Sequence, residues 1–202
     1  MLKTTFGSSL GAVILALGLS CATTGMAQQT EEPAQTTNDL SLGEPADGTV
    51  ELGTAYAKEA IGDWELRCLR TEDPANDPCQ MYQLLKDQND SPVAEVSIFR
   101  LINSGQAKAG ATIIVPLETA LQSQLTISVD GNKAKRYPFA FCNTLGCYAR
   151  IGLTEDDVSA YKRGNAAQLT IVPAMAPDQK VNLAMSLSGF TKSFDLASAV
   201  EQ

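Results

Sequence analysis

Histidine is absent from this 202-residue chain, whereas cysteine and all the other charged residue types are present. The absence excludes Ser-His-Asp and Cys-His catalytic sets, in which an imidazole transfers the proton, and it excludes imidazole metal ligands. Glycine-rich loops of the kind that cradle phosphate groups are also missing. Few catalytic templates remain, and we expect a non-enzymatic protein with no metal site and no cofactor.

An excess of basic residues is lacking too. The chain has 15 Lys and Arg against 23 Asp and Glu, which gives a formal net charge of −8. Nucleic-acid binding requires a basic patch or stripe, and here the cations are scattered among more numerous carboxylates. The sequence therefore predicts no nucleic-acid partner.

No hydrophobic run is long enough for a membrane-spanning helix, which needs about 20 residues. The longest apolar stretch, Leu10 to Leu19, follows a basic start and precedes small residues ending at Ala27, a pattern typical of a secretory signal peptide. We expect cleavage after Ala27, with a cut after Ala22 as an alternative, and both remove Cys21. Acylation of Cys21 is a further alternative. The predicted location is the periplasm, the outer membrane or the medium, without a transmembrane span.

After the predicted signal peptide (1–27), residues 28–60 are rich in Glu, Gln, Thr, Pro and Gly and poor in large apolar residues. Such a segment cannot bury enough surface to offset the entropy lost on ordering. We therefore expect a flexible acidic leader followed by one domain, residues 61–202.

Short segments with alternating apolar and polar residues follow one another through this domain, a pattern typical of strands. Apolar residues on both faces of Val93 to Ile102 predict a central strand. The clearest hairpin joins 125–129 to 135–142, and Tyr137, Phe139 and Phe141 are expected to supply much of the aromatic core. Further strands are expected at 63–68, 79–85, 112–116, 147–151, 168–173 and 180–188.

One helix is predicted between Thr154 and Gly164. Thr154 and Asp157 have the spacing of a capping box, and the acidic first turn complements the helix dipole. A weaker helix or ordered tail is expected over 191–200. Many strands, one clear helix and no strand-helix alternation predict an all-β fold, an antiparallel β-sandwich or barrel-like domain.

Four cysteines remain once Cys21 is removed, and export predicts that they form disulfides. They allow three pairings, of which the short loops favour Cys68 with Cys79 and Cys142 with Cys147. A redox pair at Cys142 and Cys147 is disfavoured, because four residues separate the sulfurs instead of two. Zinc is disfavoured because exported thiols oxidise and neither pair has the usual ligand spacing.

Two further features have a structural and a functional interpretation. The carboxylates at 155–157 cap the predicted helix or form an acid/base pair, and capping is the far commoner role of such a run. Trp64 belongs to the core or lines a sugar or peptide site, and its alternation with charged residues favours the core.

The chain resembles the invasion-associated locus B family over Gly62 to Ala197. The matching segments, in order, are Gly62-Asp63-Trp64-Glu65-Leu66-Arg67-Cys68, Cys79-Gln80-Met81, Pro138-Phe139-Ala140-Phe141-Cys142-Asn143-Thr144-Leu145-Gly146-Cys147, Tyr161-Lys162-Arg163-Gly164 and Leu187-Ser188-Gly189-Phe190-Thr191. The resemblance implies an exported all-β protein with a role in host-cell entry in the pathogen that named the family. It implies no catalytic residues.

Three hypotheses for function follow. The first is an exported interaction protein that binds an envelope or host protein through a sheet face or edge. The second is a structural or stress-related envelope factor without host contact. The third is a carboxylate-dependent hydrolase of envelope polymer, which requires two facing carboxylates about 5–10 Å apart.

Overall fold

The computed structural model describes residues 50–201 of the chain. The predicted signal peptide, Cys21 and most of the predicted leader lie outside these residues. The elements in chain order are β1 (Ala55–Ile61), β2 (Trp64–Leu69), η1 (Pro74–Asn76), β3 (Cys79–Lys86), β4 (Pro92–Ile102), β5 (Ala107–Val115), η2 (Leu121–Ser123), β6 (Leu125–Val129), β7 (Lys135–Tyr137), β8 (Phe139–Asn143), β9 (Gly146–Thr154), α1 (Glu155–Arg163), β10 (Ala166–Ile171), β11 (Val181–Ser186), α2 (Phe190–Leu196) and β12 (Ala199–Glu201).

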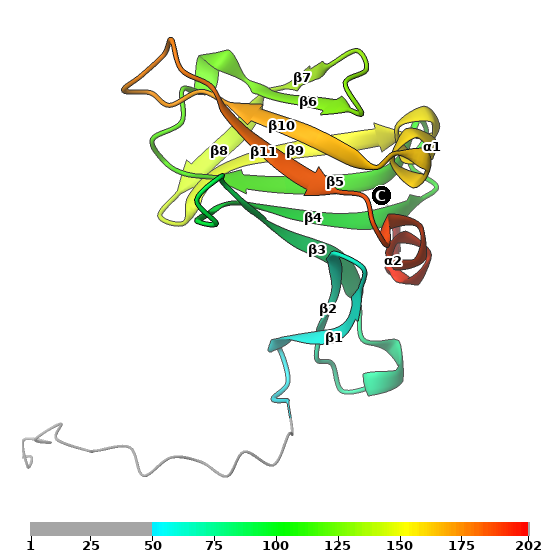
Figure 1. Ribbon diagram of the computed structural model, residues 1–202. Helices are drawn as coiled ribbons and strands as arrows, with labels where there is room; N and C mark the ends of the chain where they lie inside the picture. Colours follow the sequence, from blue (N-terminus) through cyan, green and yellow to red (C-terminus); the bar gives the residue numbers. More distant parts are fainter. Residues whose placement is uncertain (1–49, 202) are drawn as a thin grey trace, which may run out of the picture. The chain divides into compact units, whose positions relative to one another are not determined.

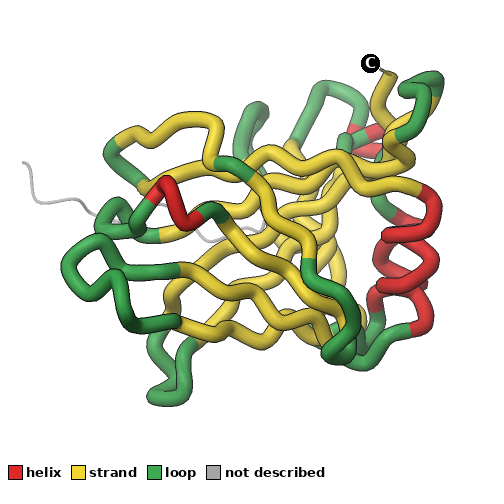
Figure 2. The backbone as a smooth tube through the Cα atoms, turned by 90° about the horizontal axis from the view of Figure 1, so that it is seen from above, coloured by secondary structure: helices red, strands yellow, loops and turns green. Residues whose placement is uncertain are grey.

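The strands form two sheets, which confirms the predicted antiparallel all-β class (Figure 1). The large sheet has the order β1-β2-β3-β4-β5-β9-β8, and the small sheet has the order β11-β10-β6-β7. One pairing is parallel, between β12 and β4. Figure 2 shows the longest helical segment (red) at one side of the strands (yellow), with shorter helical turns elsewhere around them.

The core lies between the two sheets and under the two α-helices. Its strand residues follow the predicted two-residue period, and its largest fully buried side chain is Trp64. Phe190 of α2 is fully buried and makes edge-to-face contacts with Trp64 and Tyr161, at centroid distances of 5.6 and 5.5 Å. Such pairs add stability beyond the area that they bury. The aromatic centre of the core therefore comes from β2, α1 and α2.

Strand β1 begins inside the segment that the sequence assigned to the flexible leader. It pairs with β2 from Ala55 to Ile61, so the ordered domain starts before residue 61. All but one of its side chains between Ala55 and Ala60 are exposed, and only Tyr56 is half-buried there. Because periodicity detects strands by their buried face, this edge strand left little signal.

The predicted hairpin is only half correct. Strand β6 pairs with β7 as expected, but β8 leaves the small sheet and pairs with β9 of the large one. The change occurs at Pro138, which lacks the N–H needed to continue a ladder. Consequently Tyr137 and Phe139 only flank the core, and Phe141 is 49% exposed. The expectation that these three residues supply the aromatic core was wrong.

Helix α1 has the predicted boundaries, with both hydrogen bonds of the capping box between Thr154 and Asp157. Its buried residues, Val158 and Tyr161, are the expected ones. The weaker prediction over 191–200 divides into helix α2 and strand β12. Within residues 50–201, the helices are all too short to cross a bilayer.

Candidate functional site

One face of the large sheet is turned away from the small sheet and carries a groove of about 590 Å³, which we call the sheet groove. Most of its strand residues alternate with core residues along β2 to β5, so the two-residue strand period places them on the open face, whereas Cys68 and Cys79 are buried beside it. The groove is lined by Ala55, Arg67, Cys68, Leu69, Pro78, Cys79, Gln80, Tyr82, Glu95, Ser97, Phe99, Ile114, Ser198 and Val200.

Tyr82 lies beneath the guanidinium group of Arg67 in the groove. The guanidinium carbon of Arg67 is 3.2 Å from the centroid of the Tyr82 ring, and Arg67 also forms an ion pair with Glu65. Burial raises the pKa of the Tyr82 phenol, and the charge of Glu95 raises it further, against the opposing charge of Arg67. The hydroxyl therefore stays protonated at neutral pH and keeps a hydrogen to donate.

Phe99 supplies an aromatic surface of the groove because the opposite residue on β5 is Gly110. A Cβ on Gly110 would stand 2.3 Å from Cζ of Phe99, so only glycine leaves room for the ring. Ile114 and the rim residues Leu69 and Val200 extend the apolar surface. The arrangement combines apolar area with a few polar groups, as binding pockets do.

Sequence reasoning did not identify this groove, although one signal for it was present. The second apolar face of β4, which includes Phe99, was part of the pattern that predicted a central strand, and β4 does lie between β3 and β5 in the large sheet. In the structure Val93 and Phe99 on that face are half-buried, and Leu101 is buried. The second apolar face of this central strand therefore belongs in part to the open side of the sheet that carries the groove.

The four predicted cysteines are joined in the two pairs that the spacing favours. Cys68 is bonded to Cys79 and Cys142 to Cys147, each pair with Cα atoms 4.0 Å apart. The first disulfide connects β2 to β3 beside the sheet groove, and the second connects β8 to β9. Sequence placed the two pairs on separate loops, and the structure leaves them in separate regions of the large sheet.

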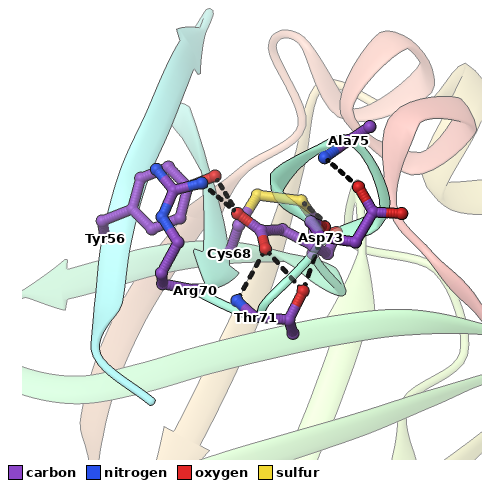
Figure 3. Close-up of polar contacts among 8 residues, drawn as sticks. Tyr56, Cys68, Arg70, Thr71, Asp73 and Ala75 are labelled. Atoms are coloured by element: carbon purple, nitrogen blue, oxygen red, sulfur yellow. Dashed lines mark hydrogen bonds and ion pairs between the residues drawn. A yellow bond between two sulfur atoms is a disulfide. The ribbon is translucent and has the colours of Figure 1, made fainter. Parts of the chain in front are cut away.

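A buried carboxylate, Asp77, holds the loop closed by the first disulfide. It accepts hydrogen bonds from the Tyr56 hydroxyl (2.7 Å), from Arg70 (2.8 Å) and from both the N–H and the hydroxyl of Thr71 (2.7 and 2.9 Å). Figure 3 shows Tyr56, Arg70 and Thr71 converging beside the sulfur of Cys68.

The electrostatics of Asp77 suit a structural role. Desolvation opposes its ionisation, but the hydrogen bonds from Tyr56 and Thr71 and the charge of Arg70 outweigh it and hold its pKa below the usual range. The carboxylate is therefore ionised at neutral pH, with both oxygens engaged, and is poorly suited to exchange protons with a substrate.

The other predicted chemical groups also have structural contacts. Asp157 caps α1 and pairs with Lys135, while the indole N–H of Trp64 donates to the Ser186 carbonyl at 3.0 Å inside the core. The sheet groove and two further hollows each include one carboxylate, respectively Glu95, Glu155 and Asp130. Over residues 50–201, no three Cys, Asp or Glu side chains are grouped as metal ligands would be.

Several known proteins are similar to this chain. The model of a family described as "Invasion associated locus B (IalB) protein" matches residues 64–198. Two proteins of Brucella abortus, from strain 2308 and from biovar 1 strain 9-941, are each named an invasion protein B homolog. Each is 25% identical over 149 residues, which cover 73% of this chain and 83% of the relative.

A solved structure has the same fold. The crystal structure of invasion associated protein B from Bartonella henselae is similar with a TM-score of 0.56 and 23% sequence identity. The likeness covers 67% of this chain and 90% of the other. Residues 64–198, which the family model matches, include the groove strands β2 to β5 and both disulfides.

Proposed function

Since this chain belongs to the invasion associated locus B family, we propose that it is an exported binding protein without catalytic activity. It acts in the periplasm, at the outer membrane or in the medium, and its partner is an envelope or host protein. The signal-peptide pattern and the two disulfides support export. The lack of histidine and the engaged state of Asp77 support a role that requires no proton transfer.

The sheet groove is the observation that carries this proposal. Its occupant is an extended segment of the partner that places an apolar side chain against Phe99 and Ile114. The Tyr82 hydroxyl and the amide of Gln80 orient the segment through hydrogen bonds. Arg67 and Glu95 give the groove one positive and one negative charge. The groove therefore selects its partner by where individual contacts lie, and not by an overall attraction to one sign of charge.

The names of the Brucella relatives support a host-related role as the finer part of the proposal. Deletion of the gene should then reduce entry of the bacterium into host cells while growth in medium stays normal. Normal entry combined with sensitivity to osmotic or detergent stress would favour the envelope factor that acts without host contact.

A matched pair of variants tests the groove itself. Val200→Glu places a charge at the groove rim, and Leu196→Glu places the same charge on α2 outside it, at sites 45% and 46% exposed. We expect the wild type and Leu196→Glu to capture the same protein from envelope or host-membrane extracts, and Val200→Glu to lose it. Equal capture by both variants would contradict the proposal.

A further inference from the structure

The large sheet ends at strand β8, and the free edge of β8 is a second candidate surface. Among the described strands, only β9 pairs with β8. Every residue from Ala140 to Asn143 is exposed. An exposed edge strand presents unpaired N–H and C=O groups that can form a ladder with another chain.

This edge differs from the others in its lack of charge. Residues 137–149 contain no Asp, Glu, Lys or Arg, although 19% of the chain is charged. By contrast, β1 carries Lys58 and Glu59, and β7 carries Lys135 and Arg136. At β11, the Gln83 side chain accepts from the Ser186 N–H and donates to the Ser186 carbonyl. Charged side chains and covering groups are the usual protection of edges, and β8 has neither in the described residues.

Large apolar side chains accompany this uncharged edge. Phe141 is 49% exposed and stacks on Tyr148 at a centroid distance of 4.7 Å, and Leu145 at the β8–β9 turn is 79% exposed. The disulfide between Cys142 and Cys147 fixes the hairpin that displays them. Because the hairpin is already ordered, an incoming strand would require little further loss of entropy on binding.

We propose that β8 pairs antiparallel with β8 of a second copy of this chain, across a two-fold axis. The choice of partner follows from charge: the full chain carries −8, removal of residues 1–27 with Lys3 leaves −8 − 1 = −9, and two such copies repel one another least where they meet at an uncharged surface. In a two-fold contact the same strand of each copy lies against its counterpart, so any charge on the strand would meet a charge of the same sign. Strand β8 carries no charged residue, so its self-pairing involves no such repulsion. Phe141 and Leu145 flank the pairing and are covered by it.

The dimer leaves the sheet groove free. Strand β8 ends the large sheet on the side opposite to β1 (Figure 1). The groove is lined by residues of β1 to β5 and β12. Two copies joined at β8 therefore present two grooves at once. When two partner molecules lie close together on a surface, binding of the first groove raises the effective concentration of the second partner at the second groove, so the dimer is held more tightly than a single copy. Self-association does not depend on the proposed function, because the groove takes no part in it.

Sedimentation velocity over a concentration series of the naturally processed protein tests the dimer. The variants are Phe141→Lys and Leu145→Lys, and the control is Leu196→Lys, which lies on α2 at 46% exposure. We expect a reversible dimer for the wild type and the control, and self-association weakened by about tenfold or more in both β8-region variants. A wild type that stays monomeric to millimolar concentration overturns the proposal.

Hydrogen exchange locates the contact. Amides of residues 139–143 should exchange more slowly in concentrated wild type than in dilute wild type, with no such difference in Leu145→Lys. Leu145 is at a turn tip, so this variant separates loss of pairing from loss of folding. A dimer that persists in Leu145→Lys, or that protects another edge, refutes pairing through β8.

Discussion

Phe99 of β4 and Gly110 of β5 face one another across the open side of the large sheet, and the ring fills the space that a side chain on Gly110 would take. The position of the Phe99 ring, and with it part of the groove surface, therefore depends on the absence of a side chain at Gly110. An added Cβ would meet three ring atoms of Phe99 at 2.3 to 3.0 Å. The ring must move if this glycine is replaced.

We therefore predict that Gly110→Ala reduces capture of the groove partner by about tenfold while the protein stays folded. The control is Gly152→Ala on the next strand, where the added Cβ meets only the Ala107 Cβ at 3.4 Å. Capture assays on both variants, with circular dichroism to verify folding, check the prediction. Unchanged capture by Gly110→Ala would show that the position of the Phe99 ring does not affect partner binding.

A second glycine pair brings two chain segments together at the end of β1. Gly62 and Gly189 both have positive φ, and a Cβ on Gly189 would stand 2.1 Å from the Ile61 carbonyl oxygen. Gly53 has a similar φ of +80° but open space around it. We expect Gly53→Ala to lower the unfolding free energy by about 1 kcal/mol from backbone strain, and Gly189→Ala to lower it by at least about 2 kcal/mol. Urea denaturation measures both values.

The Asp77 cluster predicts a pH dependence of stability. The folded-state pKa of Asp77 lies below its unfolded value, so the stabilisation is present above the ordinary carboxyl pKa and is lost as pH falls through the folded one. We expect Asp77→Asn to melt several degrees below the wild type at pH 7, and the difference to shrink at pH below about 4. Melting curves between pH 2 and 7 test this. A difference in melting temperature between wild type and Asp77→Asn that stays the same at every pH would show that ionisation of Asp77 does not stabilise the fold.

The two disulfides should contribute unequally to stability. Their cysteines are 11 and 5 residues apart, and the chain-entropy model gives about 3 kcal/mol for Cys68–Cys79 and about 2 kcal/mol for Cys142–Cys147. Paired alanine substitutions measured by urea denaturation provide the comparison. A larger loss on removing Cys142–Cys147 would show that loop closure is not the main contribution.

Local rules predicted the local features of this protein. Capping chemistry located α1, short loops indicated the cysteine pairs, and alternation located most inner-face residues. The transfer of β8 between sheets depends on tertiary packing, and periodicity carries no information about which sheet a strand joins. The groove was missed for the same reason, because sequence alone does not show whether the second face of β4 is covered.

Photocrosslinking in living cells tests the central claim most directly. A photoreactive amino acid replaces Val200 at the groove rim or, as the control, Leu196 on α2. The account predicts a crosslinked partner from position 200 and none from position 196, with about tenfold less product when Gly110→Ala is added. A partner that crosslinks from position 196 and not from position 200 would contradict binding in the sheet groove.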